Sequence, residues 1–246
     1  MKKFIIAAIL IYSGCTGLKA ADKPLAVFNK ANQLYAQGQF KQVIEIYRSL
    51  ETQKQVNSAL YYNLGNALYR DGQVGGALLN YERAWRLSPR DSDIRGNMAF
   101  VRQQVREPQP GFSQASTRFI NGLLSLNELT FLTSFMFLMC LAGAGWYLLR
   151  RSTATLAGLL CAGAAFLTCG AWLYFKIDRE ILTSSAIVMT GPAEVRNGPG
   201  ADNSVAFNLP EGRTVIVLGE TDGWTAVGLE TEGLKGWIEK RFIEKI

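Results

Sequence analysis

Two long apolar runs restrict what this chain can fold into more than any other feature of its sequence. The runs, 129–149 and 155–175, each contain about 21 residues without a formal charge. That length matches the ~20 residues that a helix needs to cross ~30 Å of hydrocarbon. Only RRSTA separates them, so they predict a two-helix transmembrane hairpin. Ser125, followed three residues later by Glu128, predicts a capping box where the first helix begins.

The first 20 residues have the pattern of a secretory signal peptide. Lys2 and Lys3 precede an apolar segment from Phe4 to Tyr12, and small and polar residues follow. An apolar segment this short does not comfortably span a bilayer, but it is typical of a signal peptide. Cleavage after Ala20 is one prediction. Lipidation at Cys15, within the lipobox-like YSGC, is the alternative that the sequence leaves open.

The leader and the hairpin together predict the side of the membrane on which the soluble parts lie. The leader carries everything before residue 129 across the membrane, and Arg150 with Arg151 favours the cytoplasm for the short loop. Lys176 and Arg179 weaken the charge argument, so the leader carries more weight. We expect a bacterial inner-membrane (cytoplasmic-membrane) protein whose soluble domains both face the periplasm or exterior.

The front part of the chain repeats itself at a fixed offset. ANQLYAQG at 31–38 and GNALYRDG at 65–72 are near copies, and Tyr47 and Tyr81 are a further pair at the same offset. A period of about 34 residues is the signature of a helix–turn–helix solenoid repeat.

Residues 58–91 resemble the tetratricopeptide repeat (TPR), and residues 24–57 match it more loosely. The positions that carry the resemblance in the second unit are Leu64, Gly65, Leu68, Gly72, Ala77, Tyr81, Ala84 and Pro89. Small residues suit the close crossing of two helices, Gly72 suits the turn, and Pro89 ends the second helix.

A third helix at 92–106 is predicted to cap the stack without a full repeat. Pro108 and Pro110 then break the helix and begin a linker, which we place at 107–128. The prediction for 24–106 is therefore an all-α TPR domain of two units and a capping helix.

In TPR arrays the inner face of each first helix binds extended peptides, and the resemblance implies such a face here. It carries over to Phe28, Asn32, Tyr35, Tyr62, Asn66, Tyr69 and Arg70. Spacings of four, seven and eight residues lie on one helical face, and Asn side chains both donate to and accept from a peptide backbone. Carboxylate-gripping TPR domains have Lys where Phe28 stands, so capture of a chain terminus is not expected. A plain scaffold surface, or contact with the chain's own C-terminal domain, is the open alternative.

From residue 185 the sequence changes to short alternating runs separated by Gly-Pro, Asn-Gly and Asp-Gly turns, which predict strands. About 60 residues of this kind predict a small, closed all-β barrel. The region 185–246 resembles a bacterial SH3-like (SH3b) domain. The residues that carry this resemblance are Val195, Arg196, Gly198, Pro199, Leu209, Pro210, Glu211, Gly212, Gly223, Trp224, Gly236, Trp237 and Ile238. Trp224 and Trp237 either line a possible SH3b groove or fill the core.

The sequence contains no constellation of catalytic residues and no metal site. It has no histidine, which removes the commonest general base and the commonest metal ligand. The four cysteines lie in the leader and the apolar runs, and the glycine clusters lack the context of a nucleotide-binding loop. We predict that the protein is not an enzyme and needs no cofactor. The net charge of +6 is not gathered into a dense basic stripe, so no nucleic-acid partner is expected.

Together these predictions describe a multi-domain membrane protein with TPR repeats, a membrane hairpin and an SH3-like barrel. This order, with SLNELTFL at 125–132, resembles the TPR-containing aerotolerance-operon proteins, the Bat family, in particular its BatE members. The resemblance implies membrane von Willebrand-A-domain partners, a MoxR-type AAA+ ATPase system and a role in envelope or oxidative stress. It predicts a non-catalytic adaptor. The alternative is a cell-wall sensor or tether whose SH3b barrel binds peptidoglycan.

Overall fold

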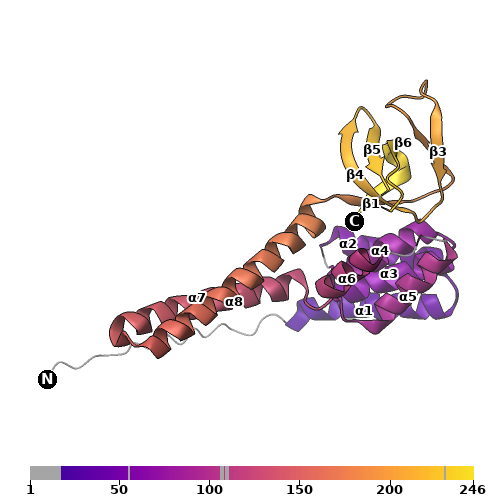
Figure 1. Cartoon of the computed structure of the whole chain (residues 1–246). Coiled ribbons are helices and arrows are strands. Elements are labelled where there is room, and N and C mark those ends of the chain that lie inside the picture. The colour runs from indigo at the N-terminus through magenta and orange to yellow at the C-terminus, as the bar shows by residue number, and fades with distance from the viewer. Residues whose placement is uncertain (1–17, 55, 106–107, 109–110, 230) are drawn as a thin grey trace.

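The computed structural model describes residues 18–246, apart from 55, 106–107, 109–110 and 230. In chain order it contains a helical N-terminal region, a long helical hairpin that projects away from it, and a β-sheet domain that sits on the helical region (Figure 1). Residues 1–17, which hold nearly all of the predicted signal peptide and Cys15, lie outside the described part of the chain.

The helical N-terminal region begins with five helices that pack as successive antiparallel pairs. They are α1 (Leu18–Ala36), α2 (Phe40–Thr52), α3 (Ser58–Arg70), α4 (Val74–Leu87) and α5 (Ser92–Gln104). The turns after α1 and α3 have the same construction, because Gly38 and Gly72 both adopt positive φ angles, 75° and 84°. In each turn two main-chain hydrogen bonds close a Schellman motif, with Gln39 N to Leu34 O at 2.9 Å in the first. Only glycine adopts this conformation without strain.

The helices cross closely because small residues stand at the crossing points. A Cβ atom on Gly65 would lie 2.8 Å from the ring of Tyr81, so α3 and α4 approach each other only because this position lacks a side chain. Asn57 and Asp91 cap α3 and α5 by accepting hydrogen bonds from main-chain N–H groups of the first turn. The core between the helices is aliphatic and aromatic, and includes the buried Tyr47 and Leu64.

The predicted linker at 107–128 differs from an open connection, because it contains a further helix, α6 (Phe112–Asn121). The two prolines interrupt the helical sequence, but residues 111–121 contain no proline and can form a helix again. Arg118 of α6 reaches the carboxylate of Glu82 on α4 at 3.2 Å, so the segment packs back onto the helical region.

The two apolar runs form α7 (Leu126–Arg150) and α8 (Thr153–Ile177). Both helices are long and apolar enough to cross a membrane, judged by length and composition, and almost none of their surface is buried inside the protein. The predicted capping box of Ser125 and Glu128 is present. The two helices pack against each other, with the rings of Phe137 and Phe166 at a centroid distance of 5.6 Å. A short π-helical segment, η1 (Asp178–Leu182), follows α8.

The C-terminal domain is a seven-stranded antiparallel sheet in the order β3-β2-β6-β5-β4-β1-β7. Its strands are β1 (Ser185–Val188), β2 (Ala193–Arg196), β3 (Val205–Leu209), β4 (Thr214–Thr221), β5 (Trp224–Gly228), β6 (Lys235–Glu239) and β7 (Ile243–Lys245), with a 3₁₀ turn, η2 (Lys240–Phe242), before the last. The predicted antiparallel strands are confirmed. Among the described residues the ladder does not pair β3 with β7, so the sheet curves around its core without the full hydrogen-bonded closure expected of a closed barrel.

The Asp222–Gly223 turn shows why the strand boundaries were visible in the sequence. Both residues have positive φ angles, 40° and 84°, and the flanking Thr221 and Trp224 pair directly. A two-residue turn of this kind matches the twist of an antiparallel hairpin. The sheet encloses a core of small and branched side chains, with Val195, Val227 and Ile238 fully buried.

Candidate interaction surfaces

The seven residues predicted to form the inner face all lie on α1 and α3. Asn32 and Arg70 are exposed, and the other five are half-buried. Phe28 packs edge-on against Tyr47 of α2 at a centroid distance of 5.3 Å. These residues therefore present a mixed aromatic and amide surface whose aromatic members are anchored by the helices behind them.

The two asparagines of this face make the same hydrogen bond in successive repeats. The hydroxyl of Tyr47 donates to Oδ1 of Asn32 at 3.3 Å, and the hydroxyl of Tyr81 donates to Oδ1 of Asn66 at 2.7 Å. Oδ1 of Asn66 also accepts from Nδ2 of Asn97 on α5 at 2.9 Å. Both lone pairs of Asn66 Oδ1 are thus used inside the protein, so the exposed Asn32 is the better placed of the two to meet a partner.

Aromatic residues that the sequence-based selection missed complete this surface. Phe40, the first residue of α2, packs edge-on against Tyr35 at 5.3 Å, and the guanidinium of Arg70 lies 5.1 Å from the centre of the Phe40 ring. On α5, Phe100 packs against Tyr69 at 5.9 Å and remains half exposed. Phe100 follows Asn66 by one full repeat period, so extending the repeat into the third helix would have identified it.

The buried tyrosine hydroxyls behind the face are packing groups. Burial raises the pKa of Tyr47 to about 12 and raises the pKa of Tyr81 as well, because the charged phenolate would lose its water. Both hydroxyls therefore stay protonated at neutral pH and serve as hydrogen-bond donors. In the described part of the chain, no group of three or more Cys, Asp and Glu side chains is placed to hold a metal ion.

Trp224 and Trp237 lie on the outer face of the sheet. On β5 the alternate residues Thr225 and Val227 are buried, and on β6 Ile238 is buried, whereas both tryptophans are half-buried. Because side chains alternate along a strand, the tryptophans point away from the core. In the β5–β6 pairing they are diagonal neighbours.

The loop beside Trp237 is held by Arg196 and by the side-chain amide of Asn203. Arg196 is the cross-strand partner of Trp237. One nitrogen of its guanidinium donates to the carbonyl oxygens of Ala201 and Asn203 at 2.8 and 2.6 Å, and the other pairs with Glu194 at 2.5 Å. The amide of Asn203 in turn donates to the carbonyl oxygens of Pro199 at 3.1 Å and Gly200 at 3.4 Å, so the NGPG segment that carried part of the SH3b resemblance is fixed next to the tryptophan surface.

The sheet domain docks on α4, and its strand β1 is shared between the cores of the two parts. Strand β1 is buried on both faces: Ala186 and Val188 belong to the core of the sheet, whereas Ile187, 1% exposed, belongs to the core of the helical region. The main-chain N–H of Gly75 donates to Glu211 at 2.8 Å.

Polar contacts extend this docking along α4. Arg83 pairs with Glu244 at 2.9 Å, and Arg86 donates to the carbonyl oxygens of Glu180 and Ile246 at 3.1 and 3.0 Å. The sheet domain thus occupies the α4 side, whereas α1 lies on the far side of the helical region (Figure 1).

Comparison with known protein families assigns one part of the chain to a domain family. Residues 191–244 match the family model of the bacterial SH3 domain, from just before β2 into β7. A search of the curated proteins found no match. The SH3 likeness of the C-terminal sheet is therefore confirmed, and β1, which enters the helical core, lies just before the matched segment.

Proposed function

We propose that the protein is a non-catalytic adaptor anchored in the inner membrane of a bacterium, with a TPR-type helical domain and an SH3b domain on the periplasmic or exterior side. The helical domain binds an extended segment of a membrane von Willebrand-A-domain protein. The complex operates with a MoxR-type ATPase system in aerotolerance or envelope stress, as in the BatE-type proteins that the chain resembles. Bacterial SH3 domains are modules for binding proteins or peptidoglycan, which agrees with this role.

The repeated construction of the helical region supports the TPR assignment. The same Schellman turn recurs at Gly38 and Gly72, and the same Tyr-to-Asn hydrogen bond recurs one repeat later. Each feature links the two helices of one hairpin. A repeated unit that cannot bury its apolar face alone is stabilised by stacking on its neighbours, and α5 supplies the last neighbour here.

The observation that carries the proposal is the separation of the two surfaces. The sheet domain docks on α4, so the face that includes Asn32 and Arg70 stays open to a partner. An extended peptide laid across this face would find amide groups for its backbone and aromatic rings for its side chains, the combination that such grooves use.

Site-specific photocrosslinking in the native membrane tests the proposal. A photoreactive residue replaces either Asn32, on the open face, or Arg48, an exposed position on α2. We expect adducts from position 32 that contain a von Willebrand-A-domain membrane protein, because only this position lies on the proposed face. Equal adducts from both positions, or adducts from position 48 alone, would discard the proposed face.

A second function, cell-wall binding by the sheet domain, is favoured by the outward placement of Trp224 and Trp237. Paired aromatic side chains on a rigid strand surface can stack on the apolar faces of sugar rings, and the fixed NGPG loop borders the same area. The protein would then be a tether between the membrane and peptidoglycan.

Sedimentation of the purified full-length chain with peptidoglycan sacculi separates the two functions. The full chain is used because Ile187 makes the sheet domain part of the helical core. If the tether function holds, Trp237→Ala releases the protein into the supernatant, whereas Val205→Ala, which changes an exposed apolar residue on β3, does not. No sedimentation of the parent chain removes the tether function and leaves the adaptor.

A further inference from the structure

Helix α6 carries large apolar side chains on a face that points away from the protein. Phe112 is 91% exposed and Phe119 is 70% exposed, and Ile120 is exposed as well. Spacings of seven and eight residues from Phe112 place the other two on the same side of the helix. Leu123, in the turn directly after α6, adds a further exposed apolar side chain. Exposed apolar patches of this kind mark contacts with another protein or with a membrane.

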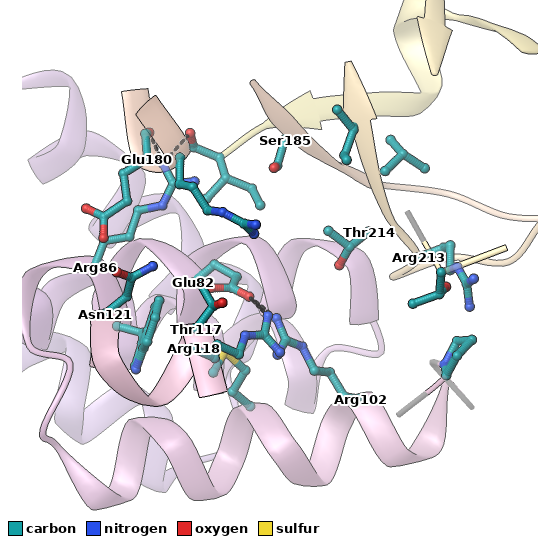
Figure 2. Close-up of a pocket in the computed structure, with 18 of the residues that line it drawn as sticks. Glu82, Arg86, Arg102, Thr117, Arg118, Asn121, Glu180, Ser185, Arg213 and Thr214 are labelled. Carbon is teal, nitrogen blue, oxygen red and sulfur yellow. Dashed lines mark hydrogen bonds and ion pairs between the residues drawn. The ribbon is translucent and has the colours of Figure 1, made fainter. Parts of the chain in front are cut away.

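The polar side of α6 packs on the helical region. Arg118 reaches Glu82 of α4 at 3.2 Å, and Thr117 and Asn121 are half-buried. Figure 2 shows these three side chains of α6 among the residues gathered around Glu82 and Arg86. A helix on the surface of a water-soluble domain normally has the opposite orientation, with its apolar stripe toward the core. The orientation of α6 therefore suits an apolar medium outside the protein.

The end of α6 is tied to the charged residues that border the two apolar runs. Lys176 directly follows the run at 155–175, and its Nζ donates to the carbonyl oxygen of Asn121, the last residue of α6, at 2.7 Å. Glu128 directly precedes the run at 129–149, and Arg90 binds both the Glu128 carboxylate and the carbonyl oxygen of Leu123. The apolar face of α6 is thus fixed where both helices of the hairpin enter the soluble region.

The rise of an α-helix sets the depth of this position. Residues 126–129 of α7 extend about 4.5 Å along the helix axis. The headgroup layer on each side of a ~30 Å hydrocarbon core is about 5–8 Å thick. When the run at 129–149 fills the core, the start of α7 lies in the headgroup layer, and residues 122–125 connect it directly to α6. Amphipathic helices at this level bury their apolar face about 5–10 Å into the boundary between headgroups and acyl chains.

We propose that α6 is an interfacial helix whose apolar face lies in the membrane leaflet on the side of the soluble domains. The residues that enter the lipid are Phe112, Phe119, Ile120 and Leu123. Arg118 carries the one formal charge of α6 and is directed to Glu82, so the contact is with the apolar part of the lipids and not with anionic headgroups. This inference rests on the membrane anchoring in the proposed function, and it adds a contact that holds the helical region against the bilayer surface.

Nitroxide labels on the full-length chain in phosphatidylcholine nanodiscs test the contact. The native cysteines are replaced by alanine, and a single labelled cysteine is introduced as Phe119→Cys on α6, Leu138→Cys in the middle of α7 or Leu218→Cys on β4. All three positions are exposed. Oxygen concentrates in hydrocarbon and a nickel chelate stays in water, so the ratio of the accessibilities to the two reagents reports the surroundings of each label.

We expect the oxygen-to-nickel ratio at position 119 to lie well above the ratio at 218, which faces water, and below the ratio at 138, which faces the hydrocarbon core. Leu123→Cys should give a ratio similar to that of Phe119→Cys. Adding phosphatidylglycerol to the nanodiscs should leave both ratios unchanged, because the face carries no charge that anionic headgroups would attract.

The label at 138 separates failure of this inference from failure of the membrane anchoring. A high ratio at 138 with the same low ratio at 119 and 218 would show that α6 faces water, and would overturn the inference while the anchoring stands. Low accessibility of position 119 to both reagents would also overturn it, because a second copy of the chain or the leader would then cover the face. A low ratio at 138 would remove the anchoring and the inference together. Melting of each labelled variant shows whether it folds, and Leu123→Cys keeps the test decisive if Phe119→Cys does not.

Discussion

The contact between Gly75 and β1 predicts opposite effects for two neighbouring glycine substitutions. A Cβ atom on Gly75 would lie 2.5 Å from the carbonyl oxygen of Val188 and 2.9 Å from Cα of Met189, so main-chain atoms of the sheet domain would have to move. A Cβ atom on Gly76 would meet a Leu68 methyl group at 3.4 Å, an ordinary van der Waals contact. Both glycines lie in the first turn of α4.

The expected magnitude follows from comparing these two positions. Replacing glycine by alanine in a helix stabilises it by about 0.5–1 kcal/mol, and this gain is similar at adjacent positions of one turn. Forcing an extra carbon into a packed site costs about 1–3 kcal/mol. We therefore expect Gly76→Ala to be neutral or stabilising, and Gly75→Ala to unfold more easily than Gly76→Ala by about 1–3 kcal/mol.

Two measurements on the full chain in detergent check this prediction. Thermal unfolding followed by circular dichroism should separate the variants by about 2–4 °C for each kcal/mol. Hydrogen exchange should locate the damage, because the amide of Gly212 donates to the same Val188 carbonyl oxygen at 2.8 Å. Its exchange should accelerate in Gly75→Ala and not in Gly76→Ala. If the two variants melt together and protect this amide equally, the close docking of α4 on β1 is refuted.

Three further predictions follow from single contacts. Ile187→Ala should lower the free energy of unfolding by about 2–5 kcal/mol and increase hydrogen exchange in α3 and β5 together, because Ile187 of the sheet domain is part of the helical core. Ile181→Ala, at a position that is 58% exposed, should change neither quantity. Increased exchange confined to the sheet would refute the shared core. Asn66→Ala should destabilise the protein by about 1–3 kcal/mol more than Asn32→Ala in thermal melts, because it removes the shared acceptor of the Tyr81 hydroxyl and the Asn97 amide, whereas Asn32→Ala removes the acceptor of the Tyr47 hydroxyl alone; equal melting would contradict the internal role of Asn66. Burial raises the pKa of Tyr47 from its ordinary value of 10.0 to about 12 in the folded chain, so stability from this group is complete at pH values below the ordinary pKa and is lost as the pH rises through the raised one. Between about pH 9 and about pH 11.5, the free energy of unfolding should therefore fall by roughly 2 kcal/mol less in Tyr47→Phe than in the parent chain. An unchanged pH dependence of unfolding would reject the raised pKa of Tyr47.

Features that depend on local chemistry were predictable from the sequence. A positive φ angle is accessible chiefly to glycine, so the glycines at 38 and 72 predict the turns that the structure contains there. The capping box at Ser125 depends on a partner three residues away, and the Asp222–Gly223 turn depends on its own two residues. The length of the apolar runs set the two long helices in the same way.

Features that depend on contacts between distant segments were not predictable. The prolines at 108 and 110 predict a break in the helix, but they do not predict α6, which is held by Arg118 against Glu82, far earlier in the chain. The sequence does contain a signal for the docking strand β1. Ala186, Ile187 and Val188 form an uninterrupted apolar run, which indicates a strand buried on both faces. The run does not say what covers the second face.

The shared core limits the kind of adaptor that the proposed function allows. In a flexible tether, the two domains would be joined through an exposed linker and would sample many separations. Here the chain passes from α8 through η1 directly into β1, and buried Lys176 ties this passage to Asn121 O at 2.7 Å and to Glu180. The open face on α1 and α3 and the tryptophan surface on β5 and β6 are therefore presented at a fixed separation. Partners bound at both surfaces would therefore be held in one geometry.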